Sequence, residues 1–144
     1  MYDVNTGRIE DRLSYLEQMI AMLRELISLE DEKILASLRD ILAMERALHL
    51  SIEAIVDVGN AMIDGFIMRD PGSYTDIVEI LRDEQVIIDS LAHKLNHFVE
   101  FRKQLVNEYT QVPVAEMIQL VRSSIEDLPQ FAPAVRAYIE KELF

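Results

Sequence analysis

Apolar residues recur every three or four positions along most of this chain, a spacing that fits an α-helix and disfavours a sheet. Residues at this spacing line one face of a helix, which a protein core can cover. Only four glycines and four prolines occur among 144 residues, which leaves few turns for a sheet, and no segment alternates as a strand would. We therefore predict an all-α protein. The first stripe, within residues ~6–28, comprises Ile9, Leu13, Leu16, Ile20, Leu23 and Ile27.

Turn and capping residues divide the rest of the pattern into further helices. Pro71 and Gly72 form a turn signal, and Ser73 opens Ser-Tyr-Thr-Asp, a capping box with Asp in place of Glu. Asp89 is the expected cap of a later helix. The helices expected after the first one cover residues ~33–65, 74–83, 90–108 and 113–142.

Two of these segments carry additional information about the architecture. Residues 52–63 are apolar on more than one face, which is typical of a helix in the middle of a bundle or at a subunit interface. Pro129 and Pro133 each remove a backbone hydrogen bond, so the last helix is expected to break near residues 128–133. The predicted fold is an antiparallel up-and-down bundle of four main helices plus one short helix, in a single domain over residues 1–144.

Composition limits the classes of function that are open to the chain. It has no cysteine, and therefore no disulfide, thiolate nucleophile or cysteine-based zinc site. No apolar run reaches about 18 residues and the N-terminus lacks a signal pattern, so we expect a cytoplasmic protein without a membrane segment. The formal net charge of −12 repels nucleic acid at long range. An RNA site would require local clustering of the few Arg and Lys residues, and a cationic partner fits the overall charge better.

The run from Phe101 to Tyr109 carries the residues with the clearest chemical meaning: Arg102, Asn107 and Tyr109. Metal-independent RNA cleavage requires a cation beside the charged phosphorane and groups that move protons at the 2′-OH and at the leaving oxygen. The planar fork of Arg suits the first role because it binds phosphate bidentately and stays charged. Five residues along a helix correspond to about 140° around its axis, so residues 102 and 107 do not share a face. We expect the site where the helix ends, or where two subunits meet.

The spacing of these residues resembles the Arg-x4-His-x-Tyr signature of the HepT-like toxins, a branch of the HEPN superfamily of small helical RNases. Residues 45–60 resemble the second-helix region of these proteins, and residues 64–74 resemble the loop and short-helix entry of a YutE-like sub-branch. The resemblance implies an all-helical homodimer that brings two Arg-centred motifs to one cleft and cleaves RNA without a metal. It also implies a minimal nucleotidyltransferase antitoxin as partner, which in some members adds AMP to the motif tyrosine, here Tyr109.

Asn107 stands where the signature has histidine, and asparagine cannot act as a general acid or base. Because acid–base catalysis typically contributes about 10²- to 10⁴-fold, cleavage should be weakened. Two interpretations follow. One is a HepT-like RNase toxin component, a metal-independent endoribonuclease with reduced activity. The other is a catalytically inactive module that binds nucleotide or RNA or serves as the partner of a nucleotidyltransferase. The intact spacing of Arg102 and Tyr109 disfavours a plain helical interaction protein.

The three motif residues each have a structural alternative. Arg102 and Asn107 are the expected catalytic and substrate-binding pair, whereas an arginine at a helix end and a left-handed asparagine C-cap are the alternatives. Tyr109 either contacts substrate and accepts the modification, or packs at a helix end.

Polar residues elsewhere on the second helix are further candidates for substrate binding. Asp57 and Asn60 lie in its most apolar part, and buried Asp and Asn side chains normally require partners. Asp57 is therefore expected either to orient Arg102 across the bundle, or to join Asn60 in satisfying a helix end or an interface.

Two cationic residues complete the list of candidates. Arg69, together with Asp70, either lines the cleft or belongs to a simple Arg–Asp pair that holds the loop. Lys103 either extends a basic patch around the motif or lies on a solvated face.

The histidines do not predict a metal site. Asp89, His93 and His97 are spaced four residues apart, but the first and last would lie about 12 Å apart along a helix, so one ion cannot reach all three. We interpret them as surface histidines with Asp89 as a cap, and predict neither a metal nor a cofactor. His49, alone on the second helix, is interpreted as structural.

Overall fold

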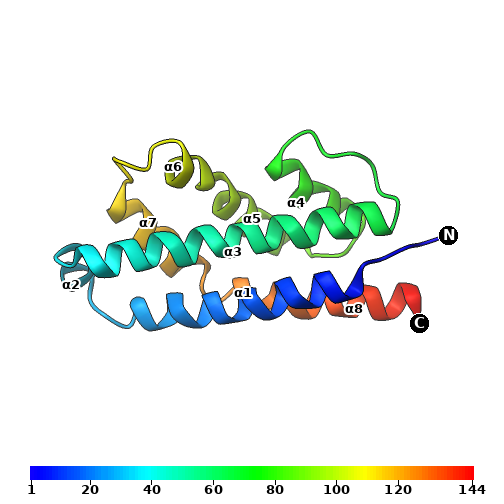
Figure 1. Ribbon diagram of the computed structural model, residues 1–144, viewed down its shortest axis with the longest axis horizontal. Coiled ribbons are helices and arrows are strands. Elements are labelled where there is room, and N and C mark those ends of the chain that lie inside the picture. Colours follow the sequence, from blue (N-terminus) through cyan, green and yellow to red (C-terminus); the bar gives the residue numbers. More distant parts are fainter.

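Two long antiparallel helices form the centre of the molecule. In the computed structural model, which describes residues 1–144, α1 (Thr6–Leu26) and α3 (Leu38–Gly65) lie side by side, and the short α2 (Asp31–Leu35) lies in the turn between them (Figure 1). The predicted apolar stripe of α1 is buried, except that Leu26 takes the place expected for Ile27. Thirteen residues of α3 are buried, and they occupy several sides of this helix, as its apolar content predicted.

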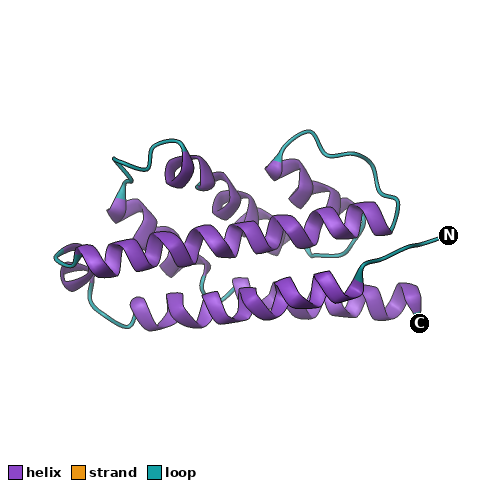
Figure 2. Ribbon diagram, viewed as in Figure 1, coloured by secondary structure: helices purple, strands orange, loops and turns teal.

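The other helices cover these two from different sides. α4, α6 and α7 pack against α3, α5 packs against α4 and α7, and α8 runs beside α1 near both chain ends (Figure 1). Figure 2 shows helices joined by loops, with no strand. No helix combines the length and the apolar composition needed to cross a bilayer. Their bounds are α4 (Tyr74–Asp83), α5 (Asp89–Glu100), α6 (Arg102–Val106), α7 (Val114–Ser124), the 3₁₀ turn η1 (Leu128–Gln130) and α8 (Phe131–Leu143).

The all-α fold class is confirmed, and the structure corrects several helix ends. The predicted helix 33–65 is two helices, because Ser37 caps α3 by accepting the backbone N–H of Asp40 at 3.2 Å. The predicted helix 90–108 breaks at Phe101. Asp89 is not a cap: Ile88 holds the cap position of α5 and no side chain bonds there. The last predicted helix is interrupted between Ser124 and Phe131, a stretch that includes Pro129, whereas Pro133 lies in the first turn of α8 and does not break it.

The loop from α3 to α4 begins with an unusual residue. Ile67 has a φ of 57°, a left-handed conformation that disfavours β-branched side chains. The Met68 N–H donates to the Ile63 carbonyl at 2.9 Å, which makes Ile67 the left-handed position of a Schellman motif where glycine is usual. Gln85, with a φ of 61°, holds the same position after α4, where the Val86 N–H donates to the Leu81 carbonyl at 2.8 Å.

α4 approaches α3 closely at a single glycine. A Cβ atom built on Gly59 would overlap the Cγ2 methyl of Ile77, so no larger residue fits without movement of one helix. Ile77 and Leu81 are buried on the inner face of α4. Gly59 therefore fixes how near α4 and its first residue, Tyr74, come to α3.

Arg122 joins the C-terminal half of the chain to the turn between α1 and α2. Its terminal nitrogens donate to the carbonyls of Ile27 at 2.9 Å and Leu29 at 2.8 Å, and its Nε donates to Asp31 at 2.9 Å. Ile27 is the C-cap of α1 and Leu29 lies in the turn after it, where the helix supplies no donor for these carbonyls. One side chain of α7 satisfies them here.

Candidate functional site

A break in the helical path determines where Arg102 lies. α5 ends at Glu100, the buried Phe101 forms the junction, and α6 begins at Arg102. The Phe101 carbonyl accepts the N–H groups of Gln104 at 3.0 Å and Leu105 at 3.3 Å, so the chain turns tightly and continues as helix. The sequence predicted a helix end after the motif, near residue 108, whereas the structure also places a break before it, with Arg102 at the first residue of a short helix.

Arg102 is held by two other helices. Its Nε donates to Glu53 Oε1 of α3 at 2.5 Å, and its guanidinium carbon lies 4.5 Å from the ring centroid of Tyr74 in α4. Cation–π contact of this kind is favourable. The side chain is 27% exposed and its two terminal nitrogens have no hydrogen-bond partner in the protein. The contacts thus fix the Nε side of the guanidinium and leave the N–H groups of its two terminal nitrogens free to bind an anion.

Asn107 and Tyr109 follow at the other end of α6. The Asn107 N–H donates to the Lys103 carbonyl at 2.9 Å and ends the helix. Its φ of −92° is right-handed, so the left-handed cap that the sequence favoured is wrong, although the cap position is correct. Both side chains are exposed, Tyr109 at 70%, and neither makes a hydrogen bond within the protein. Tyr109 therefore does not pack into the fold.

Sequence reasoning missed the carboxylate and the histidine beside Arg102. His49 Nε2 lies 3.5 Å from the same Glu53 oxygen that accepts from Arg102, and Arg46 Nη1 lies 3.5 Å from His49 Nδ1. His49 and Glu53 are one helical turn apart on α3, and Arg46 precedes them on the same face. This spacing was visible in the sequence, but nothing local indicated that the motif would lie against it.

The candidate Asp57 has different partners from those expected. It lies one turn beyond Glu53 and contacts Arg12 Nε at 3.4 Å and Arg8 at 3.9 Å, both from α1, and it does not meet Arg102. The side chain is 36% exposed, so its expected burial is also wrong. Glu53 occupies the place that the sequence assigned to Asp57.

Asn60 is exposed as well, and its surroundings link it to the site. It lines a surface pocket of about 430 Å³ together with Tyr74, whose ring contacts Arg102. The pocket also includes the turn Pro71–Ser73 at the start of α4. Asn60 is thereby brought near the Arg102 site through Tyr74, without a contact to Arg102 itself.

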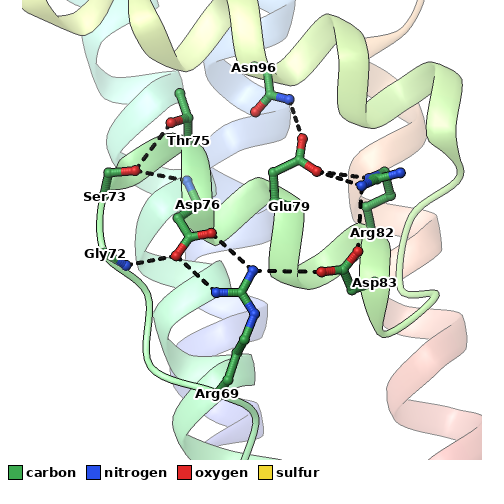
Figure 3. A network of polar contacts seen from close by, with 9 residues as sticks. All are labelled: Arg69, Gly72, Ser73, Thr75, Asp76, Glu79, Arg82, Asp83 and Asn96. Atoms are coloured by element: carbon green, nitrogen blue, oxygen red, sulfur yellow. Dashed lines mark hydrogen bonds and ion pairs between the residues drawn. The ribbon is translucent and has the colours of Figure 1, made fainter.

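Arg69 is used to hold the loop before α4, as Figure 3 shows. It donates to both oxygens of Asp76 at 3.0 Å and lies 3.6 Å from Asp83, so an Arg–Asp pair does hold the loop, with Asp76 as the partner and not Asp70. Asp76 also accepts the Gly72 N–H at 2.8 Å. The hydrogen bonds from Arg69, and then from Gly72, lower the pKa of Asp76, and the pKa of Arg69 is raised in turn. Arg69 is therefore committed to the loop.

The capping box that the sequence predicted is modified in the same network. Ser73 Oγ accepts the Asp76 N–H at 3.1 Å, but the Asp76 carboxylate reaches back to Gly72 where a standard box uses the cap residue's own N–H. A second group in Figure 3 connects α4 with α5, where Asn96 donates to Glu79 at 2.7 Å. This hydrogen bond, ahead of one from Arg82, lowers the pKa of Glu79.

The remaining candidates lie apart from this arrangement. Lys103 is exposed next to Arg102, and its side chain has no polar partner in the protein. The rings of His93 and His97 meet edge to face at 4.9 Å in a pocket between α5 and α7, and Asp89 lies 3.8 Å from Arg82. No three His, Cys, Asp or Glu side chains gather as a metal site requires.

Comparison with known protein families identifies a model that covers most of the chain. The family described as Ribonuclease HepT-like matches residues 16–135. YutE of Bacillus subtilis (strain 168) is 38% identical over 143 residues, which span 99% of this chain and 95% of that protein. The tRNA nuclease HepT of Aphanizomenon flos-aquae (strain 2012/KM1/D3) is 20% identical over 96% of this chain and 95% of its own length.

Solved structures agree with these sequence matches. The structure of YutE from Bacillus subtilis, described as a cytosolic protein of unknown function, superposes with a TM-score of 0.90 at 40% identity, covering 99% of this chain and 96% of that one. The tri-AMPylated HEPN toxin of Shewanella oneidensis, in complex with the MNT antitoxin, gives a TM-score of 0.81 at 18% identity. That alignment covers 90% of this chain and 97% of the toxin. At that identity the second likeness concerns the fold alone.

Proposed function

The chain belongs to the Ribonuclease HepT-like family, and on that premise we propose that it is the RNA-directed toxin component of a pair with a nucleotidyltransferase antitoxin. The observation that carries the proposal is the guanidinium of Arg102, fixed by Glu53 and Tyr74, with both terminal nitrogens unpartnered. Such a fork matches a phosphodiester, whose two free oxygens accept parallel N–H bonds. The tRNA nuclease HepT of Aphanizomenon flos-aquae supports RNA, and tRNA first, as the substrate.

In this proposal Arg102 binds the scissile phosphate and stabilises the charge that develops on the phosphorane. Asn107, exposed at the end of α6, donates a hydrogen bond to the phosphate or to the 2′-OH. Lys103 and Asn60 contact the flanking nucleotides, and Tyr109 stacks on a base. Because the protein is strongly acidic, binding depends on these local contacts rather than on its overall field.

The first experiment is an RNA binding and cleavage assay in EDTA, with tRNA and short single-stranded RNA. Arg102→Ala should weaken binding at least about tenfold, because hydrogen bonds to a charged group contribute roughly 1.5–3 kcal/mol. Arg102→Lys should recover only part of the loss, since lysine lacks the fork. Lys141→Ala, which removes one positive charge from α8, is the control. Equal binding by wild type and Arg102→Ala would refute the assigned site.

A homodimer completes the proposed site. Leu38 and Leu42 are 69% and 53% exposed on α3, and the same face continues into Arg46, His49 and Glu53. Two copies that cover these leucines would therefore bring two Arg102 sites toward one cleft. Light scattering at micromolar concentration should give twice the chain mass for wild type and a monomer for Leu42→Glu. A monomeric wild type would exclude this arrangement.

The antitoxin half of the proposal rests on Tyr109. Its 70% exposure leaves the phenol open to an enzyme, and the Shewanella oneidensis HEPN toxin in complex with the MNT antitoxin is tri-AMPylated. Incubation with ATP and a nucleotidyltransferase encoded beside this chain should add AMP, detected by mass spectrometry, to wild type but not to Tyr109→Phe. Tyr15→Phe, at another exposed tyrosine, should be modified like wild type. The cytosolic description of YutE supports a cytoplasmic site of action.

The alternative is an inactive homologue that binds RNA or nucleotide, or serves only as the nucleotidyltransferase's partner. Asn107 favours it, because the side chain has no proton to exchange near neutral pH. Arg102-dependent RNA binding without any cleavage would select this alternative.

A further inference from the structure

A histidine lies beside Arg102 although the signature position holds asparagine. His49 Nε2 and Arg102 Nε contact the same oxygen, Glu53 Oε1, at 3.5 and 2.5 Å. The two nitrogens therefore lie no farther apart than the sum of these distances. The His49 side chain is 27% exposed, so solvent and substrate can reach it. An imidazole is the side chain best suited to proton transfer near neutral pH.

We propose that His49, oriented by Glu53, is the general base that Asn107 cannot be. The inference rests on the proposed RNA-directed function, and it adds the residue that moves the proton. Glu53 is then a positioning residue that holds both the phosphate-binding arginine and the base.

The contacts determine which ring nitrogen acts. Arg46 can only donate, so Nδ1, which it faces, carries the lone pair, and Nε2 carries the proton on the side of Glu53. Arg46 faces Nδ1 at 3.5 Å, at the outer limit of a hydrogen bond. A phosphate oxygen of bound RNA offers Arg46 a charged acceptor, which frees Nδ1. The arrangement follows the logic of a carboxylate-oriented histidine in other enzymes.

The charged groups around the imidazole come from two helices. Arg46 and Glu53 belong to α3 and flank the ring, and Arg102 of α6 lies beyond Glu53. The phenol of Tyr74, on α4, faces the far side of Arg102. The guanidinium groups of Arg46 and Arg102 outnumber the one carboxylate, Glu53, that contacts His49 or Arg102, which favours a bound phosphodiester.

The reaction then balances without a metal. Nδ1 of His49 takes the proton of the 2′-OH, O2′ forms a bond to phosphorus, and the bond from phosphorus to O5′ breaks. The electron pair leaves with O5′, which takes a proton from water, and the imidazolium returns its proton to the hydroxide that remains. The products are a 2′,3′-cyclic phosphate and a 5′-hydroxyl. Arg102 stabilises the phosphorane that forms on the way from the RNA to these products.

The test measures cleavage in EDTA and RNA binding separately, for the full chain. We expect His49→Gln to lower the cleavage rate by about 10²-fold or more, while binding of 2′-O-methyl RNA, which lacks the attacking hydroxyl, stays within about twofold. His93→Gln, at an exposed histidine of α5, is the matched control and should cleave like wild type. Circular dichroism melts establish that each variant folds.

Two further readouts separate a chemical role from a structural one. The wild-type cleavage rate should fall as the pH drops and the base becomes protonated, and this limb of the profile should vanish in His49→Gln. Added imidazole should restore part of the activity of His49→Ala, because a small base can enter the vacated space.

Each outcome decides between the two proposals. Equal cleavage rates and pH profiles for wild type and His49→Gln would overturn the assignment of His49 and leave the proposed function intact. Arg102-dependent RNA binding without cleavage by wild type would also overturn it, and would favour an inactive homologue. Neither binding nor cleavage by wild type would overturn the proposed function itself.

Discussion

Arg102 donates its Nε–H to Glu53 Oε1 at 2.5 Å, a contact between two helices whose residues are 49 positions apart in the chain. The side chains are 27% and 33% exposed, so solvent screens the pair, and a coupling of about 0.5–1 kcal/mol is expected. A double-mutant cycle with Glu53→Ala and Arg102→Ala, followed by urea unfolding, measures this coupling. Glu53→Gln, which keeps an oxygen acceptor, should lower the free energy of unfolding less than Glu53→Ala does. Additive single effects would mean that the contact does not hold the arginine.

Substitution by alanine should lower the free energy of unfolding at Gly59 and raise it at Gly7. At Gly59 the new methyl overlaps Ile77 Cγ2, and overpacking typically costs about 1–3 kcal/mol, more than the roughly 1 kcal/mol that alanine gains as a helix former. At Gly7 the methyl has only Asn5 Oδ1 nearby, at 3.9 Å, so the substitution should stabilise by up to about 1 kcal/mol. Chemical denaturation compares the two. A stable Gly59→Ala protein would show that α4 moves easily away from α3.

Ile67→Gly should raise the free energy of unfolding, although it removes a side chain. The left-handed conformation of Ile67 strains a β-branched residue, glycine adopts it freely, and the side chain is 71% exposed with little burial to lose. We expect a gain of about 0.5–1 kcal/mol. Gln85→Gly, at the equivalent position after α4, is the control. Its free energy of unfolding should rise less, because glutamine is not β-branched. Urea midpoints measured side by side test the order, and a loss at residue 67 would contradict it.

The contact between Arg69 and Asp76 should make stability depend on pH in the acid range. The pKa of Asp76 in the folded protein lies below its ordinary value of 3.8, chiefly because Arg69 bonds to the carboxylate. The ionised group therefore stabilises the fold above that value, and this contribution is lost as the pH falls through the lowered pKa. The difference in stability between wild type and Asp76→Asn should be largest near neutral pH and shrink in strong acid.

The control for this experiment is Asp70→Asn, which removes an equal charge from the same loop where no ion pair forms. Urea unfolding at a series of pH values should show a constant, small difference for Asp70→Asn. A constant difference for Asp76→Asn as well would contradict the assigned pairing.

The clearest helix end in the sequence was set by neighbouring residues, although the equally local Ser37 cap of α3 was missed, and an end set by distant contacts could not be predicted. The bounds 74–83 of α4 follow from Ser73 and Asp76, whose cap is local, and they are confirmed. The break at Phe101 has neither glycine nor proline to announce it. It coincides with the point where Arg102 meets Glu53 and Tyr74 from two other helices, and this information is absent from any short window of sequence.

The choice of carboxylate at the site failed for a related reason. Glu53 and Asp57 are four residues apart on one face of α3, so helical periodicity treats them alike. They differ in their position along α3 relative to α6. Glu53 lies where Arg102 of α6 can contact it, whereas Asp57, one turn further, contacts Arg12 and Arg8 of α1. The kinds of residue needed at the site could be predicted from the chemistry of RNA cleavage. Which residues contact one another could be learned only from the three-dimensional structure.

The hydrogen bonds of Arg122 imply an order in which parts of the fold can form during synthesis. The carbonyls of Ile27 and Leu29 receive their partner from a residue 95 and 93 positions later, so they stay solvated while the first two thirds of the protein leave the ribosome. The first and third helices can already associate at that stage, but the corner between them stays open. The corner therefore reaches its native hydrogen bonding only after α7 has been synthesised, near the end of the chain.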